Sequence, residues 1–280
     1  MNVVFFGIGL MGGSMALAMK EFGFAQNYYG ISRNSETIKK AIQLGLINQS
    51  GAIEEIVPKA DVVVLATPIN SIINQLPLVL DLIKDDAVVI DMGSTKESIT
   101  KSVENHPKRK NFVATHPIAG TEYSGPESAF ANLYKEKVCI ICDQEKSNPQ
   151  IVKKVEELYT KMQMKLVYMS AKEHDSYLAF VSHLSHILSF ALSNTVLEKE
   201  KNNKAILDLA GSGFASTVRL AKSSPDMWVP ILLDNQNHVI QAIEDYIHQL
   251  KNLKQSISHQ NAQEIFNFIK KANEIGKIVK

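Results

Sequence analysis

The chain begins with a short apolar segment that runs directly into a glycine-rich turn. Residues 3–6 read Val-Val-Phe-Phe, and Gly7, Gly9 and Gly12 follow with the spacing G-x-G-x-x-G. Residues 14–22 are rich in Ala, Met and Leu, which is typical of a helix. In this order the glycines serve a tight turn, a close approach to a pyrophosphate and close packing of helix on strand. The pattern predicts a dinucleotide-binding unit, and a turn of purely structural use is the alternative.

Strand-like and helix-like segments alternate along the next part of the chain. Strands are predicted over residues 28–32, 61–66, 87–91 and 112–115, with helices over 36–44, 69–83 and 96–104 between them. Two further apolar segments, 138–142 and 165–169, flank a helix that follows Pro149. Such alternation predicts an α/β fold with a doubly wound parallel sheet of the Rossmann type.

The pattern changes near residue 170. From there to the end helical periodicity dominates, with one break around residues 211–213. We therefore expect a dinucleotide-binding domain over residues 1–170 and an all-α domain over residues 171–280 that binds substrate and mediates dimerisation. Its long apolar helices need a partner to cover them, and a homodimer is the default expectation.

Composition excludes several classes of function. The formal net charge of the 280 residues is +1, which argues against bulk attraction to nucleic acid or to an anionic membrane. We find neither a signal peptide nor an apolar run long enough to span a bilayer, so a cytoplasmic protein is expected. Cys139 and Cys142 are the only cysteines. Strand alternation points them to opposite faces, which favours two buried thiols over a redox or metal site, and no metal is expected.

The end of the second predicted strand bears on which dinucleotide binds. An acidic residue there would bind a ribose 2′-hydroxyl and favour NAD, but this chain has Ser32-Arg33-Asn34. Because Arg33 can pair with a 2′-phosphate, NADP is favoured slightly over NAD, and a solvated loop arginine is the alternative. The candidate cofactor-binding residues are Gly7, Gly9, Leu10, Met11, Gly12, Ser32, Arg33 and Thr67.

A histidine follows the strand predicted over residues 112–115. His116 would lie at the carboxyl edge of the sheet, where open α/β folds bind their ligands. Ser94 follows the neighbouring strand, 87–91, so the two side chains are expected to come together there. Imidazole suits a base that accepts a hydroxyl proton near neutral pH, and a serine hydroxyl can orient the ring. A strand-end histidine bonded to the backbone is the alternative.

The helical half offers two further candidates. His183 and His186 have the i,i+3 spacing of one helix face and are expected to contact substrate or to pack as a pair. Arg219 lies in an apolar helical stretch, where a guanidinium requires an anion and can bind a carboxylate with both of its arms. A salt bridge to Asp208 or Asp226 is the alternative.

Together these segments resemble the prephenate dehydrogenases of tyrosine biosynthesis. The matching residues are 7–14 (GIGLMGGS), 93–96 (GSTK), 116–122 (HPIAGTE), 182–186 (SHLSH) and 219–228, ending at the single tryptophan. They occur in the family's order over nearly the whole chain. Residues 116–122 are the most specific of them, and the glycine loop is the least specific.

The resemblance implies oxidative decarboxylation of prephenate to 4-hydroxyphenylpyruvate with reduction of NAD(P)+. It implies that His116 is the catalytic histidine that bonds the substrate's 4-hydroxyl and that Ser94 supports it. By the same resemblance Arg219 binds a substrate carboxylate and His186 lines the pocket. Thr121 and Glu122 belong to the loop after His116, where Glu122 would order or gate the site.

Three other functions fit parts of the pattern. Arogenate dehydrogenase acts on the amino-acid analogue of prephenate and gives tyrosine directly. The β-hydroxyacid dehydrogenases and imine reductases share the two-domain plan; the hydroxyacid enzymes carry a catalytic lysine early in the helical domain, and residues 174–194 contain no lysine. A redox sensor that binds cofactor without turnover would leave His116, Ser94 and Arg219 unexplained together.

Overall fold

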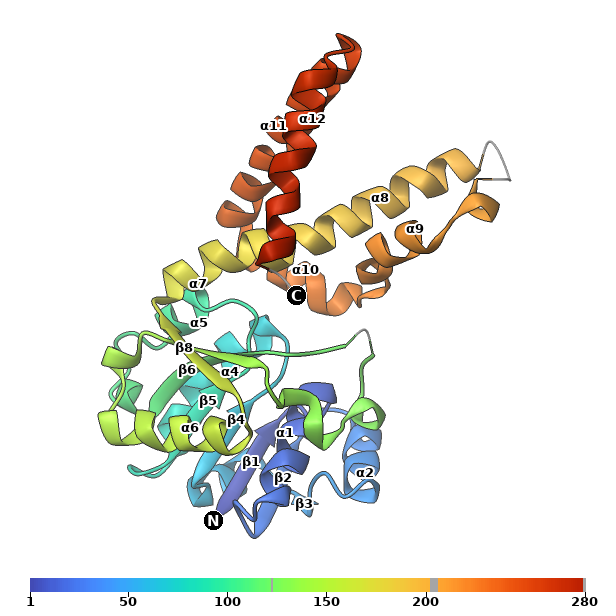
Figure 1. Ribbon diagram of the computed structural model, residues 1–280. Coiled ribbons are helices and arrows are strands. Elements are labelled where there is room, and N and C mark those ends of the chain that lie inside the picture. The colour runs from blue at the N-terminus through green and yellow to red at the C-terminus, as the bar shows by residue number, and fades with distance from the viewer. Residues whose placement is uncertain (122, 202–205, 279–280) are drawn as a thin grey trace.

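The computed structural model describes residues 1–121, 123–201 and 206–278. Two parts are evident in Figure 1: a sheet with helices on both sides, and a helical part above one edge of that sheet. The chain passes from one to the other at Ser170, which follows the last strand and caps the next helix.

The sheet has eight strands in the order β3-β2-β1-β4-β5-β6-β7-β8. From β3 to β6 all neighbouring pairs are parallel, as predicted. The strands are β1 (Asn2–Phe6), β2 (Asn27–Ile31), β3 (Gln49–Ser50), β4 (Val62–Leu65), β5 (Val88–Asp91), β6 (Phe112–Ile118), β7 (Val138–Cys142) and β8 (Lys165–Met169).

The last two strands run in the opposite direction to the rest, which the prediction of a parallel sheet did not include. Strand β7 is antiparallel to β6, and β8 is parallel to β7. Only short 3₁₀ turns at Pro126–Ser128 and Ala131–Tyr134 lie between β6 and β7 among the described residues. A parallel return needs a crossover helix, and α6 (Pro149–Lys161) provides one between β7 and β8 but none precedes β7.

Each face of the sheet has its own hydrophobic core. On β1, Val3 and Phe5 belong to one core, and Val4 and Phe6 belong to the other, as strand alternation requires. Cys139 and Cys142 are likewise buried in opposite cores, as predicted. The helices α1 (Leu10–Glu21), α2 (Ser35–Gln43) and α6 cover the first face, and α3 (Ile53–Ile56), α4 (Ile69–Leu82) and α5 (Glu97–Lys101) cover the second.

The helical part starts with one long continuous helix. It comprises α7 (Ala171–Leu178), a π-helical turn (Ala179–His183) and α8 (Leu184–Glu200). After it come α9 (Ser212–Thr217), a 3₁₀ turn (Arg219–Lys222), α10 (Pro225–Asp234), α11 (Gln236–Ser258) and α12 (Ala262–Ala272). Figure 1 shows α11 and α12 side by side as an arm that projects away from the sheet.

The continuous helix Ala171–Glu200 is long and apolar enough to cross a membrane, with a mean hydropathy of 1.2 over an 18-residue window. The sequence-based expectation was that no such run exists; residues 176–197 carry no charged side chain, although serines and histidines interrupt the apolar residues. Core helices of soluble proteins have the same length and composition, so the feature is weak evidence for a membrane. Only 11% of that window is buried within the chain, which leaves most of its apolar surface without a partner.

Strand β6 is longer than predicted. It continues through His116 to Ile118, because antiparallel pairing with β7 extends beyond its parallel pairing with β5. His116 lies opposite Ile140 of β7 and therefore sits within the strand, two residues before its end.

Candidate functional site

The glycines of the first turn fit the three roles expected of them. Gly7 has φ +87°, and a Cβ atom there would lie 2.6 Å from the carbonyl oxygen of Ala66. At Gly12 a Cβ atom would lie 2.1 Å from the carbonyl oxygen of Gly7. A Cβ atom at Gly9 would meet no atom of the described residues within 4 Å, so Gly9 faces the open space that a pyrophosphate would fill.

The start of α1 can receive an anion. Gly9 precedes the helix without a side-chain cap, and the first turn, which begins with Leu10 and Met11, contains no acidic residue. Its backbone N–H groups and the positive end of the helix dipole are therefore available to phosphate. Thr67 lies beside this turn, with its Cγ2 3.1 Å from the position of a Cβ atom on Gly7. These residues fit a dinucleotide.

Ser32 and Arg33 follow the end of β2. The Ser32 hydroxyl accepts a hydrogen bond from the Asn34 N–H at 3.2 Å, and the Asn34 side chain in turn caps α2. The Arg33 side chain is exposed. The turn thus fixes the Ser32 side chain. It leaves the Arg33 guanidinium next to the strand end at which such folds bind the ribose of a dinucleotide.

A buried carboxylate organises the carboxyl edge of β5. Asp91 accepts hydrogen bonds from the N–H groups of Gly93 and Thr115, at 2.8 and 3.0 Å, and forms a fully buried ion pair with Lys96. Burial raises the pKa of the Asp91 carboxyl, and the Lys96 ammonium and the N–H donors act against that rise. This cluster ties the end of β5 to β6 directly before His116.

The His116 ring is part of a buried chain of polar contacts. Its Nδ1 lies 2.8 Å from Nε2 of His174, and Nδ1 of His174 lies 2.7 Å from Oδ1 of Asp175. His116 is 9% exposed, His174 is fully buried and Asp175 is 3% exposed. Among the described residues, Nε2 of His116 has no hydrogen-bond partner.

The surroundings hold both rings neutral. Burial lowers the pKa of His116 well below its usual value, and His174, Lys96 and His183 act in the same direction. Burial also lowers the pKa of His174, with Lys96 and His183 contributing. A neutral imidazole is the form that accepts a proton, so the site is suited to base catalysis.

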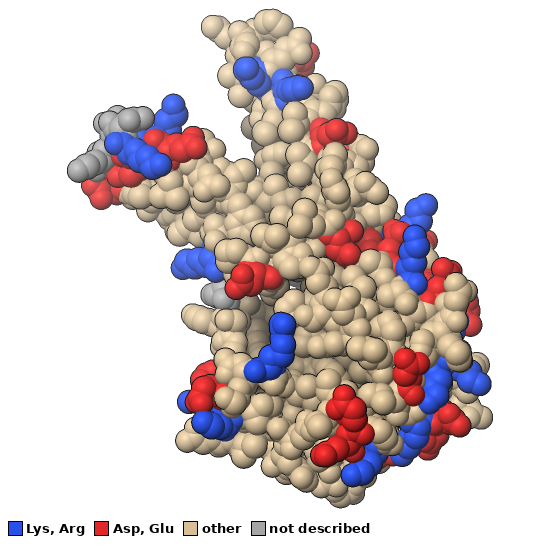
Figure 2. All heavy atoms as spheres, turned by 180° about the vertical axis from the view of Figure 1, so that it is seen from behind, with Lys and Arg blue, Asp and Glu red and all other residues tan. Residues whose placement is uncertain are grey.

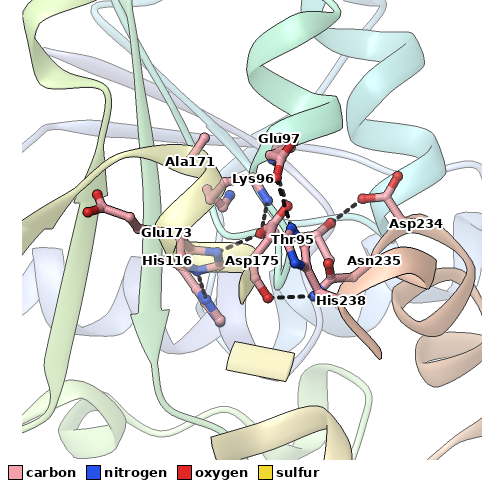
Figure 3. A network of polar contacts seen from close by, with 12 residues as sticks. Thr95, Lys96, Glu97, His116, Ala171, Glu173, Asp175, Asp234, Asn235 and His238 are labelled. Atoms are coloured by element: carbon pink, nitrogen blue, oxygen red, sulfur yellow. Dashed lines mark hydrogen bonds and ion pairs between the residues drawn. The ribbon is translucent and has the colours of Figure 1, made fainter. Parts of the chain in front are cut away.

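Two carboxylates of the helical part hold the loop after β5 (Figure 3). Asp175 accepts from the backbone N–H groups of Lys96 and Glu97, at 2.7 and 2.8 Å. Asp234, at the end of α10, accepts from the hydroxyls of Thr95 and Ser98, at 2.5 and 2.6 Å. The loop that carries Ser94 is therefore positioned from both domains.

Ser94 and His116 lie at the same edge of the sheet: Ser94 is in the loop after β5, and His116 is in the neighbouring strand β6. Ser94 is half-buried. Within the described part of the chain, however, the hydrogen bond on the His116 ring goes to His174 and not to Ser94. The expected orienting role of the Ser94 hydroxyl stays a prediction.

Both candidate histidines of the helical part pack against Trp228 of α10. The rings of His186 and Trp228 are stacked with centroids 3.7 Å apart, and His183 packs edge-on against Trp228 at 5.9 Å. Sequence reasoning allowed a packed histidine pair, and both histidines do pack here. Burial lowers the pKa of His186, and the nearby Arg219 guanidinium lowers it further.

The position of Arg219 differs from the one expected. It lies in the 3₁₀ turn after α9 and its side chain is exposed, because α9 ends at Thr217 before the arginine can enter a helix interior. No ion pair with Asp208 or Asp226 forms among the described residues.

Thr121, in the loop after β6, is exposed, and its hydroxyl accepts from the Tyr123 N–H at 3.3 Å. Glu122 lies outside the described residues.

One hollow of the protein lies away from this edge of the sheet. A cavity of about 950 Å³, open to solvent, is lined by Asp61, Val62 and Val88 at the amino ends of β4 and β5. It contains none of the candidate residues. We place the candidate site at the carboxyl edge, because the polar network and the glycine turn converge there.

Sequence reasoning missed three residues of the site: Lys96, His174 and Asp175. His174 and Asp175 are neighbours in the first turns of α7, and periodicity alone does not distinguish such a pair from surface residues. The useful signal is positional, since a His-Asp pair follows directly after the last strand of the sheet, next to the candidate active-site edge.

Comparisons with known proteins match nearly the whole chain. The family model described as "Prephenate dehydrogenase, nucleotide-binding domain" matches residues 15–168, and "Prephenate dehydrogenase, dimerization domain" matches residues 170–271. The prephenate dehydrogenase of Bacillus subtilis (strain 168) is 29% identical over 98% of this chain and 74% of its own length.

Two solved structures extend the match to three dimensions. A prephenate dehydrogenase from A. aeolicus, crystallised with hydroxyphenyl propionate and NAD+, superposes with a TM-score of 0.90 at 33% identity, covering 100% of this chain and 98% of that one. An arogenate dehydrogenase from Synechocystis superposes with a TM-score of 0.82 at 26% identity, covering 100% of each chain.

Proposed function

Since the chain belongs to the prephenate dehydrogenase family, we propose that it oxidatively decarboxylates prephenate to 4-hydroxyphenylpyruvate with reduction of NAD(P)+. The observation that carries the proposal is the neutral His116 at the carboxyl edge of the sheet. It lies on the same edge as the glycine turn, and among the described residues its Nε2 has no partner. A base in that place suits a substrate hydroxyl beside a nicotinamide.

The bound nicotinamide supplies the acceptor for the hydride that leaves C4 of the substrate. His116 accepts the proton of the 4-hydroxyl at Nε2 while the carbonyl forms. The bond to the ring carboxylate then breaks, CO2 leaves, and its electron pair completes the aromatic ring, whose phenolate oxygen takes a proton. Arg219, exposed beside His186, binds a substrate carboxylate through its planar guanidinium. Ser94 and Thr121 contribute hydroxyls, and Glu122 is assigned to the same loop.

The cofactor follows from the turn and from the end of β2. Gly7, Gly9, Leu10, Met11, Gly12 and Thr67 receive the dinucleotide, and the cation at Arg33 beside Ser32 favours NADP over NAD. Arg33→Ala should raise KM for NADP+ about tenfold and change KM for NAD+ little. Lys39→Ala, which removes an exposed cation of α2, is the matched control. An equal change for both cofactors would refute the assignment.

The protein is proposed to be a cytoplasmic homodimer. A model described as a dimerization domain covers residues 170–271, and the apolar helix Ala171–Glu200 is largely uncovered within one chain. Cys139 and Cys142 are free thiols, which suits a reducing compartment.

Arogenate dehydrogenase is the second candidate. It is favoured by the superposition on the arogenate dehydrogenase from Synechocystis. The two substrates differ at the side-chain keto or amino group, and no described residue is assigned to that group.

Initial rates with prephenate and with arogenate, each with NAD+ and with NADP+, test the proposal. We expect turnover of prephenate, and faster turnover of arogenate would select the alternative. If none of the four mixtures reacts, the enzyme assignment fails. His116→Asn should lower kcat about 10²-fold or more, with cofactor affinity nearly unchanged.

A further inference from the structure

The first helix of the helical domain presents a histidine and a carboxylate to the candidate base. His174 and Asp175 are consecutive residues of α7, and both are buried. The chain of contacts runs from Asp175 Oδ1 through the His174 ring to Nδ1 of His116, with separations of 2.7 and 2.8 Å. The hydrogen-bond partners of these atoms determine which of them donates and which accepts.

Asp175 is an acceptor at both carboxylate oxygens. The peptide N–H of Lys96 donates to Oδ1, and that of Glu97 donates to Oδ2. Burial raises the pKa of the Asp175 carboxyl, and the two N–H donors and the Lys96 ammonium act against that rise by stabilising the ionised form. Since each oxygen already accepts from a peptide N–H, the carboxylate is the acceptor in its contact with His174. The proton between Asp175 and His174 therefore belongs to Nδ1 of His174.

The orientation of the second bond follows from the first. The buried His174 ring is neutral, so with a hydrogen on Nδ1 its Nε2 carries only a lone pair. A lone pair there requires a hydrogen on Nδ1 of His116. The neutral His116 ring must then have a bare Nε2, which is the form that accepts a proton from a substrate hydroxyl.

We propose that His174 and Asp175 are positioning residues that hold His116 in the tautomer with hydrogen on Nδ1 and a lone pair on Nε2. The inference rests on the proposed function, since it assigns His116 Nε2 as the atom that receives the substrate proton. Neither residue needs to touch substrate. A wrong tautomer at a comparable catalytic histidine lowers kcat by about 10⁴-fold, so such control is large enough to matter.

The same pair joins two parts of the site. Asp175 also fixes the loop that carries Ser94 and Lys96, and its own backbone carbonyl accepts from Asn235 of the segment between α10 and α11 at 2.7 Å. The helical domain thus sets the tautomer of a ring on β6 and the position of the loop after β5 through one carboxylate (Figure 3).

Nitrogen-15 NMR of the histidine rings tests the tautomer directly and requires no turnover. In the intact, cofactor-free protein we expect His116 to show a protonated Nδ1 and an unprotonated Nε2. His174→Leu removes the acceptor, so the His116 ring should lose this single tautomer. His174→Gln places an amide oxygen close to the position of the former Nε2 and should keep it. His106→Asn, at a histidine that bonds Asp81 and lies outside the site, should leave the His116 ring unchanged.

Kinetics separate positioning from a merely structural role. We expect His174→Leu to lower kcat about 10²-fold with KM for the substrate changed less than about threefold, and His174→Gln to recover most of the rate. The proposal is overturned if wild-type His116 carries its hydrogen on Nε2, or if His174→Leu leaves the tautomer unchanged. If His174→Leu does not fold, the wild-type spectrum and His174→Gln still decide. A correct tautomer without turnover would count against the proposed function alone.

Discussion

Gly9 and Gly12 lie three residues apart in one turn but differ in the space around them. A methyl group at Gly12 would clash with the carbonyl of Gly7, whereas one at Gly9 would meet no atom within 4 Å in the part of the chain that the structure describes. Gly9→Ala should therefore fold with a Tm close to wild type and bind dinucleotide at least tenfold more weakly. Gly12→Ala should lower Tm by several degrees or abolish folding, at a cost of about 2 kcal/mol or more. Equal Tm values with equal cofactor Kd values would contradict this account.

The fall of kcat/KM at acid pH should reflect protonation of the buried base, His116. Because the pKa of His116 is lowered well below 6.5, the ring stays neutral as the pH falls through 6.5. We expect kcat/KM to hold through pH 6 and to fall tenfold per pH unit only below the lowered pKa. The groups that face the ring are His174 and Asp175 from α7, Lys96 from the loop after β5 and His183 from the π turn. An acid limb at or above pH 6.5 would mean that the base is not this buried ring.

Single residues were predictable from the sequence where a short local motif identifies them. The glycine spacing and the His116 segment each carry a local signature, and the structure places both at one edge of the sheet. His174 and Lys96 carry no such signature, because their roles depend on contacts between residues 58 and 5 positions apart that only the folded chain makes. Arg219 was expected inside an apolar helix, but α9 ends at Thr217 and the arginine lies, exposed, in the 3₁₀ turn that follows.

The π-helical turn between α7 and α8 sets which residues face the site. It contains His183 and separates the anchored His174–Asp175 pair from His186, which stacks on Trp228. Deleting Phe180, a largely exposed residue of that turn, should restore α-helical spacing and rotate α8 by about 100°. We expect turnover to fall more than about 10²-fold while cofactor Kd changes less than about threefold.

Phe180→Ala is the control for that deletion, because it removes the side chain and keeps the spacing. It should retain near wild-type turnover. If the deletion retains it too, the register of α8 does not matter for the site.

Helices and strands were predicted well where the apolar residues recur with a clear period. The direction of a strand within the sheet was predicted less well, because it depends on the segment that connects it to the strand before. The strands and helices that were predicted up to β6 lie within a few residues of their predicted bounds, whereas the short β3 and α3 were not predicted. The reversal of β7 was not predictable from its apolar pattern, since a strand reads the same in either direction. What decides it is that the described residues between β6 and Val138 form only 3₁₀ turns and no crossover helix, a feature of topology rather than of composition.

The arm formed by α11 and α12 leaves an apolar surface uncovered on one chain. Ile240, Ile247, Leu250 and Ile257 are exposed and recur along α11 with the spacing of a single helical stripe. On the face of the arm seen in Figure 2, most of the surface belongs to uncharged residues. Exposure of a continuous apolar stripe marks an interaction surface, and continuity with the apolar helix Ala171–Glu200 makes a second copy of the chain its proposed partner.

Sedimentation tests this assembly. The wild-type protein should sediment at twice the 31.1 kDa of one chain. Ile247→Asp should shift it towards the monomer, because burying an unpaired carboxylate in an apolar interface costs several kcal/mol. Gln249→Asp adds the same charge away from the stripe on the same helix and should leave the dimer intact. A wild-type monomer, or an Ile247→Asp protein that associates as tightly as the control, would show that this stripe is not the dimer interface.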